Sequence, residues 1–290
     1  MNKTSSIKTL LKVMTTIPTS VLIMIVLGVI YTMMMGFWGL GLDTFTQDFG
    51  VMLGSICLVV TAYVYWTLID KKHFSAIGII SPWRAGIANL LWGSLLGITL
   101  VSLGVALLFL LGFASWRGLV IAGNPALAWG IGVLTFAMVA VGEEIFSRGY
   151  AVKTLMPHFG VNGSILLSAL LFSALHIANP YVSWLPMLNV FLMGLLLGWT
   201  FWRTGSLWFS IGLHWTWNIA QGIIFSLRVS GLETPGIMHV AVDGPTIITG
   251  GNFGIEGGII VTGLILIGFL AVEMYSRRLS LGRVAASFGE

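Results

Sequence analysis

The chain has 290 residues, of which 57% are hydrophobic and 8% are charged, and its formal net charge is +4. This composition, with apolar runs of about 20 residues, the length that crosses a bilayer, predicts a polytopic membrane protein without a separate soluble domain. The basic residues stand singly or in pairs at the ends of apolar runs, which argues against nucleic-acid binding. Cys57 is the only cysteine, so an internal disulfide and a cysteine-based metal cluster are excluded.

Eight apolar runs predict eight membrane-spanning helices in one all-α transmembrane bundle. The first run follows Lys3, Lys8 and Lys12, but it is longer than the apolar part of a signal peptide and lacks a small-residue cleavage site. We therefore expect it to remain as the first helix. The predicted spans lie near residues 17–40, 50–69, 86–113, 127–147, 162–178, 187–202, 207–226 and 258–275.

The distribution of Lys and Arg predicts the orientation of these spans. If the N-terminus is inside, the outer segments contain only Arg117 and Arg228. The positive-inside rule then predicts that the N-terminus and the C-terminus are both cytoplasmic. The longest polar stretch, near 227–258, falls outside, and its Gly, Pro and Asp content predicts turns. The inner segments hold Lys71, Lys72, Arg84, Lys153, Arg203, Arg277, Arg278 and Arg283.

The fourth span contains the charged stretch VGEEIFSRGY. Adjacent helical residues are turned by about 100°, so Glu143 and Glu144 cannot point the same way. Glu144 and Arg148 are four residues apart and can form a buried pair. Glu143 then has no local partner, which suits a general base or acid. The alternative is that this stretch is the cytoplasmic end of the span, with all three groups in water.

The fifth span contributes His176, which shares a helix face with Phe172. We expect the chain to reverse at Phe159 and Gly160. Glu143 lies about 16 residues before this reversal and His176 about 16 residues after it, so an antiparallel hairpin places both at one depth. The alternative is an interior histidine that only bridges helices by hydrogen bonds.

The seventh span carries His214 and Asn218, which are four residues apart and share a face. Taken alone, this pair could be a polar seam that joins helices. Three helices that each offer inward polar groups favour a shared site. The chain lacks HExxH, GxSxG and a phosphate-binding glycine loop, so zincin, serine-hydrolase and nucleotide-binding functions lack their residues.

Together the three stretches resemble a known family. EEIFSR matches an EExxxR motif, FSALH matches FxxxH, and HWTWN matches HxxxN, in the order found in the CPBP intramembrane proteases. That family includes the type II CAAX prenyl endopeptidase and bacterial proteins linked to bacteriocin processing or self-immunity. The resemblance divides the chain into N-terminal transmembrane helices at 1–126, a CPBP-like catalytic core at 127–226, and an extracytoplasmic loop with the final helix at 227–290.

The resemblance implies an intramembrane endopeptidase of the CAAX-protease type, a metalloprotease or a glutamate-type enzyme, in a bacterial plasma membrane. It implies that Glu143 and His176 activate a water molecule, and that His214 and Asn218 stabilise the oxyanion. The other charged residues of the first motif, Glu144 and Arg148, would be structural support.

The cofactor and the function leave alternatives open. Glu143, His176 and His214 could supply three ligands to a divalent metal such as zinc, although no conventional zinc motif is present. The expected partners are a peptide or membrane-protein substrate and the lipid bilayer. Competing functions are a proton-coupled transporter that uses the same groups as a relay, and a non-catalytic membrane scaffold or immunity protein.

Overall fold

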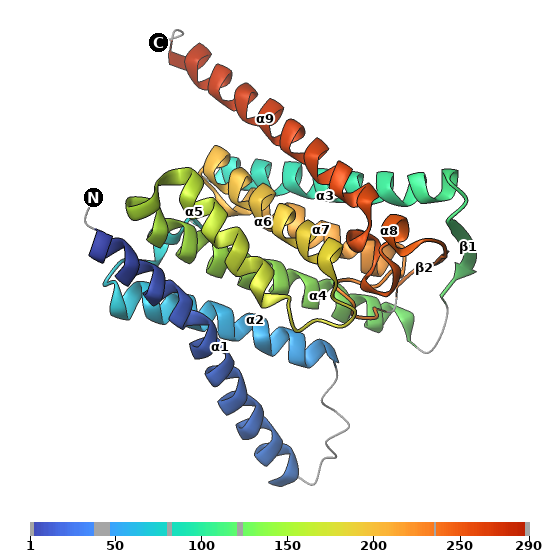
Figure 1. Cartoon of the computed structure of the whole chain (residues 1–290), viewed down its shortest axis with the longest axis horizontal. Helices are drawn as coiled ribbons and strands as arrows, with labels where there is room; N and C mark the ends of the chain where they lie inside the picture. The colour runs from blue at the N-terminus through green and yellow to red at the C-terminus, as the bar shows by residue number, and fades with distance from the viewer. Residues whose placement is uncertain (1–2, 38–46, 80–82, 121–123, 235, 288–290) are drawn as a thin grey trace.

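The computed structural model describes residues 3–37, 47–79, 83–120, 124–234 and 236–287, and it confirms the all-α bundle (Figure 1). Among these residues, six helical segments are long and apolar enough to cross a membrane. The eight predicted spans correspond to eight helices, with boundaries that differ by several residues. These helices are α1 (Lys3–Phe37), α2 (Gln47–Tyr63), α3 (Trp83–Leu110), α4 (Pro125–Glu144), α5 (Lys153–Leu175), α6 (Trp184–Thr204), α7 (Leu207–Asn218) and α9 (Ile259–Ser287).

Shorter elements extend or connect these helices. Three of the helices continue directly into π-helices: α2 into η2 (Val64–Ile69), α4 into η4 (Ile145–Val152) and α7 into η5 (Ile219–Ile224). The connections contain η3 (Phe74–Ile77), α8 (Thr246–Thr249), η6 (Gly251–Phe253) and η7 (Ile255–Gly257). Strand β1 (Ala114–Leu119) pairs antiparallel with β2 (Met238–Val242), with Ser115 opposite Ala241 and Trp116 opposite Val240. This two-stranded sheet is absent from the elements that the sequence predicts.

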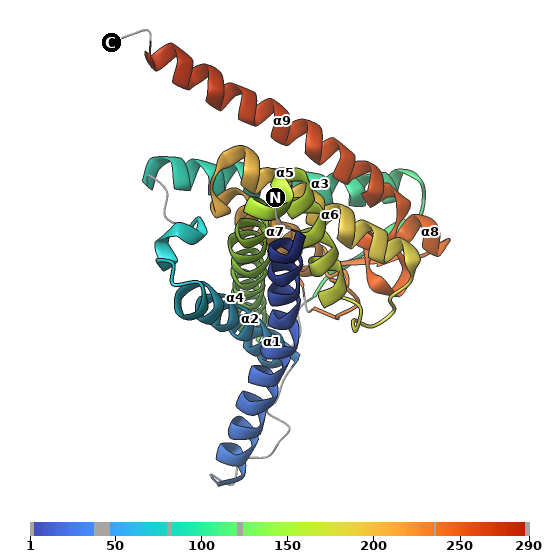
Figure 2. The ribbon, with the colours of Figure 1, turned by 60° about the vertical axis from the view of Figure 1, so that its left-hand side comes forward.

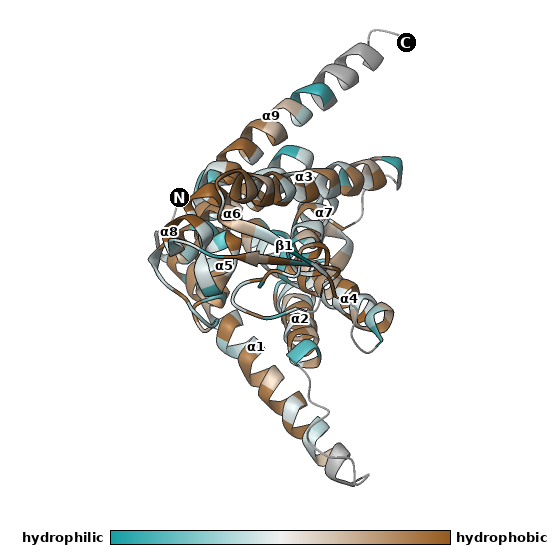
Figure 3. Cartoon of the chain, turned by 90° about the vertical axis from the view of Figure 1, so that its right-hand side faces the viewer, coloured by the Kyte–Doolittle hydropathy of each residue, from teal (hydrophilic) through white to brown (hydrophobic). Residues whose placement is uncertain are grey.

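The first helix differs most from its prediction. It begins at Lys3 instead of near residue 17, while the predicted residues 38–40 lie outside the described part of the chain. Figures 1 and 2 show α1 and α9 diverging from the bundle on opposite sides. Figure 3 shows α1 as hydrophobic along most of its length, and Leu22 on it is 61% exposed. Exposed apolar side chains on a span fit contact with lipid.

The helical segment from 125 to 175 is a hairpin of two helices. Gly160 breaks it with φ 65° and ψ −178°, a conformation that glycine adopts without the strain of a Cβ. Across the hairpin, the Ser168 hydroxyl donates a 2.7 Å hydrogen bond to the carbonyl oxygen of Ser147. The predicted reversal at Phe159 and Gly160 is therefore confirmed.

The connections gather at two opposite ends of the bundle, as alternating spans require. At one end, Lys153 donates to the carbonyl oxygen of Ala76 at 2.6 Å. At the other end, Gln47 donates to the carbonyl oxygen of Glu233 at 2.9 Å, and β1 pairs with β2. The N-terminus lies at the left in Figure 1 and the strands at the right. We call these the N-terminal end and the strand end.

Helix α7 lies in the centre of the bundle because two glycines let it approach α3. A Cβ added at Gly97 would lie 2.4 Å from the carbonyl oxygen of Leu213, and one at Gly212 would lie 2.4 Å from that of Leu90. Small residues at helix contacts allow such close backbone packing in membranes. Consequently His214 and Asn218, which α7 carries, are both buried.

We predict that Gly212→Ala lowers the free energy of unfolding by about 1–3 kcal/mol, because the added methyl group meets backbone that cannot move aside. The measurement is the thermal unfolding midpoint in detergent. Gly130→Ala on α4 is the matched control, since its Cβ would have no atom within 4 Å. Equal midpoints for the two variants would contradict the close contact between α3 and α7.

Candidate active site

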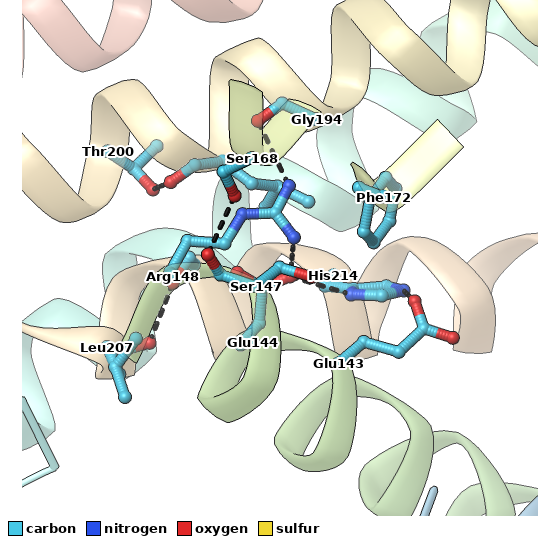
Figure 4. Close-up of polar contacts among 12 residues, drawn as sticks. Glu143, Glu144, Ser147, Arg148, Ser168, Phe172, Gly194, Thr200, Leu207 and His214 are labelled. Atoms are coloured by element: carbon cyan, nitrogen blue, oxygen red, sulfur yellow. Dashed lines mark hydrogen bonds and ion pairs between the residues drawn. The ribbon is translucent and has the colours of Figure 1, made fainter. Parts of the chain in front are cut away.

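A buried ion pair lies at the centre of the bundle, where η4 follows α4 (Figure 4). Arg148 Nη1 donates to Glu144 Oε1 at 3.1 Å, and both side chains are 0% exposed. Arg148 Nη2 donates to the carbonyl oxygen of Gly194 at 3.0 Å, and the guanidinium lies 4.3 Å from the ring centre of Phe172. The predicted buried pair is confirmed. The alternative, a solvated end of the span, is wrong.

The same carboxylate contacts a histidine from the seventh span. His214 Nδ1 lies 3.1 Å from Glu144 Oε1, and His214 Nε2 lies 4.0 Å from Glu143 Oε2. Glu144 therefore holds His214 as well as Arg148, whereas the sequence analysis paired it with the arginine alone. The contact joins residues 70 positions apart, so no local pattern could have indicated it.

A π-helix begins directly after Glu144 and another directly after Asn218. These are η4, which begins at Ile145, and η5, which begins at Ile219. The π-helical turn is rare and occurs frequently at functional sites. Both segments thus change their helical winding at the residues that carry the polar groups.

A cavity of about 420 Å³ collects the predicted site residues. Glu143, His176, His214 and Asn218 all line it, and they come from α4, the end of α5 and α7. The Glu143 side chain is 17% exposed, in contrast to the fully enclosed Glu144. This size lies within the range of about 300–1,000 Å³ that is typical of small-ligand pockets. Adjacent glutamates therefore have different surroundings, as their helical spacing predicted.

The orientation of His176 follows from its backbone contact. His176 caps α5 just after the helix ends at Leu175, and its Nδ1 lies 2.8 Å from the carbonyl oxygen of Phe172. A carbonyl oxygen can only accept a hydrogen bond, so Nδ1 carries the proton. In the neutral ring, Nε2 is then left as a proton acceptor. Among the described contacts, no hydrogen bond joins His176 directly to Glu143.

Glu256 also lines the cavity, and the sequence analysis did not identify it. Its carboxylate accepts a hydrogen bond from the backbone N–H of Ser230. Asn189 fixes the turn by donating to the carbonyl oxygens of Glu256 at 2.8 Å and Gly258 at 2.9 Å. Burial raises the pKa of the Glu256 carboxyl, against the opposing effects of the Ser230 N–H and of the nearby histidines 176 and 214. The acidic residue inside the glycine-rich GGNFGIEGG was the available signal.

The predicted metal ligands do not form a metal site in this arrangement. In the part of the chain that the structure describes, no three His, Cys, Asp or Glu side chains are grouped so that they could hold a metal ion. Glu143, His176 and His214 line one cavity. Zinc binding stays a prediction.

The cavity lies inside a membrane bundle, and its lining includes carboxylates, two histidines and side-chain amides, which are groups that hydrolases use. Residues 125–220 match the Rce1-like family, whose description is 'Type II CAAX prenyl endopeptidase Rce1-like'. The match confirms the resemblance carried by the three motifs and supports a protease of the CPBP family. No curated protein and no solved structure matches the chain significantly.

We predict that Glu144→Gln destabilises the protein and that Glu143→Gln does not. Losing the Glu144 charge leaves Arg148 uncompensated in a dry site, at a cost of about 3–5 kcal/mol. Glu143→Gln is the matched control, because that carboxylate faces the cavity. The readouts are protein level in the membrane fraction and the unfolding midpoint in detergent. Equal stability of the two variants would contradict the separate roles of the adjacent glutamates.

Proposed function

We propose that the protein is a glutamate-type intramembrane endopeptidase of a bacterial plasma membrane, which hydrolyses a peptide bond within the cavity. The observation that carries this proposal is the convergence of Glu143, His176, His214 and Asn218 on one cavity from separate helices. Peptide hydrolysis needs proton acceptors beside a water molecule and hydrogen-bond donors beside the carbonyl oxygen. The cavity offers both kinds of group, and the family match supports the protease class.

Glu143 and His176 are suited to activate the water molecule. An ionised Glu143 accepts the proton of the water as its oxygen attacks the carbonyl carbon, while Nε2 of His176 accepts the second hydrogen bond and holds the water. The proton on Glu143 is then transferred to the amine as the C–N bond breaks. The products are a carboxylic acid and an amine, and Glu143 returns to its ionised form.

His214 and Asn218 are suited to stabilise the oxyanion. The amide group of Asn218 donates hydrogen bonds without any change of charge. Because Nδ1 of His214 faces Glu144, Nε2 can donate only when the ring is an imidazolium. The two carboxylates, Glu143 and Glu144, are then balanced by Arg148 and this imidazolium. Glu144 is thus a positioning residue, which fixes the ring of His214.

We predict that Glu143→Gln abolishes proteolysis while the protein stays folded, because the amide keeps the shape of the side chain but cannot take a proton from water. The test is a proteomic comparison of membranes and medium from cells that carry the wild type or the variant. Glu233→Gln is the control, since that exposed carboxylate lies outside the cavity. Peptides that disappear only in Glu143→Gln identify the substrate.

If the proteomic comparison finds no such peptides, the endopeptidase function is wrong. The remaining alternatives are then the proton-coupled transporter and the non-catalytic scaffold or immunity protein. Transport that depends on Glu143 at an unchanged peptide pattern would indicate the proton-coupled carrier. A wild-type phenotype of Glu143→Gln at a normal protein level would indicate the scaffold or immunity protein.

We predict that Asn218→Ala lowers kcat by about a hundredfold to a thousandfold, the usual effect of losing one oxyanion donor, with little change in KM. Kinetics on a substrate from the proteomic comparison provide the test. Metal analysis of the wild type and the variant tests the other role, because loss of a metal ligand would reduce bound zinc and added zinc would partly restore activity. Wild-type turnover in Asn218→Ala would show that the HxxxN stretch is a packing seam.

A further inference from the structure

We propose that the cavity opens to the extracytoplasmic side of the membrane, and that its substrate is a peptide segment exposed there, such as the outer part of an exported, membrane-anchored peptide. A cytoplasmic C-terminal tail is then excluded as substrate. The class of substrate rests on the proposed protease function. The side of the membrane to which the cavity opens is inferred from the position of the cavity in the bundle and from the charges of the connections.

The connections that line the cavity all belong to the strand end of the bundle. Gln47 and Asp48, at the start of α2, contribute to its wall. The loop that follows η5 contributes Ser230, Thr234 and Glu256. Within the described residues, none of the lining residues comes from the opposite connections, at 70–79, 148–160 and 203–206. The cavity is therefore bounded by one set of connections only.

Helices α5, α6 and α9 contribute to the cavity from the turns nearest the strand end, whereas α1, α2 and α4 contribute residues as deep as Ile17, Leu58 and Glu143. Helix α5 approaches this end with its last turn, and Phe172 and His176 line the cavity from there. Helix α6 leaves this end with its first turns, which provide Asn189 and Met193. Helix α9 contributes Val261, close to its first residue. The cavity thus extends from the strand end into the middle of the bundle.

The other half of the bundle is filled by packed side chains. A hydrophobic cluster beyond Glu144 contains Phe146, Tyr150 and Val152 of η4, all 0% exposed. Ile77 and Leu207 pack into the same cluster and are also 0% exposed. A packed interior of this kind leaves no path for a peptide. A substrate therefore does not reach Glu143 through the N-terminal end.

The charges of the connections assign the two ends to the two sides of the membrane. Lys153 and Arg203 belong to the N-terminal end, together with Lys71, Lys72 and Lys12. The strand end has only Arg117 and Arg228 among the described residues, and Arg228 is paired with Glu233. Short connections rich in Lys and Arg stay in the cytoplasm. The mouth of the cavity is therefore extracytoplasmic.

The rim of the mouth is held in place and borders the lipid. The Glu256 carboxylate accepts a hydrogen bond from the Ser230 N–H, which joins two parts of the loop, and Gln47 donates to the Glu233 carbonyl oxygen, which fixes the loop against α2. On another side the wall is α1, where Val21 and Met24 line the cavity and are 47% and 41% exposed. A wall shared between cavity and bilayer suits a substrate that is anchored in the membrane.

Impermeant thiol labelling of intact cells tests the opening in a Cys57→Ser background. We expect Thr234→Cys, on the cavity wall, to react from outside with a sulfonated maleimide. His239→Cys, an exposed position of β2 outside the cavity, should react likewise. Lys72→Cys, at the N-terminal end, should react only after permeabilisation.

Cleavage of the substrate that the proteomic comparison identifies is then measured on labelled and unlabelled cells. The label on Thr234→Cys should lower cleavage by about a hundredfold, the order of effect that a misplaced substrate shows, relative to the unlabelled variant. The label on His239→Cys should leave cleavage unchanged.

Each part of the proposal has its own contradicting result. Reaction of Thr234→Cys only after permeabilisation overturns the extracytoplasmic mouth, even if Glu143→Gln abolishes proteolysis. Reaction from outside without loss of cleavage overturns the mouth as the path of the substrate. If Glu143→Gln changes no peptide, the proposed protease fails together with its substrate class, and the labelling still decides the side of the opening.

Discussion

The structure depends on the compensation of charges in an interior that water does not reach. Arg148 is fully enclosed, and an isolated charge in such a place is too costly to persist without partners. Glu144, the Gly194 carbonyl oxygen and the ring of Phe172 supply them. These partners belong to α4, α5 and α6, so satisfying one guanidinium also fixes how three helices meet. His214 is attached to the same carboxylate from a fourth helix.

This arrangement explains why the adjacent residues Glu143 and Glu144 have different surroundings. Glu144 is paired with Arg148 and His214 and is closed to the cavity, whereas Glu143 lines the cavity, where we propose that it takes a proton from water. Helices are more rigid than loops, and catalytic groups need to be held within fractions of an ångström. The close packing of α7 on α3 at Gly97 and Gly212 serves the same purpose, because it fixes the depth of His214.

The strand end contributes a loop that forms part of the cavity wall. The loop after η5 covers one side of the cavity, and Asn189 and the Ser230 N–H hold Glu256 there. Loops commonly carry the groups that determine what a site accepts, because they can vary without disturbing the packed interior. The loop also contributes to a buried core cluster on this side of the bundle, which includes Phe253, Ile255 and Val261. Irregular backbone at membrane depth must be enclosed by protein or line a polar cavity, and parts of this loop do each.

The sequence by itself determined the all-α class, the reversal at Gly160 and the pairing of Glu144 with Arg148. The length of the apolar runs, the glycine at the reversal and the spacing of four residues between the paired charges are local signals. Each depends only on residues that are close in the sequence. Only the tertiary structure decided that His214 is bound by Glu144 and that Glu256 reaches the cavity. Those contacts join segments that are distant in the sequence. They depend on how whole helices pack, so a short sequence pattern cannot predict them.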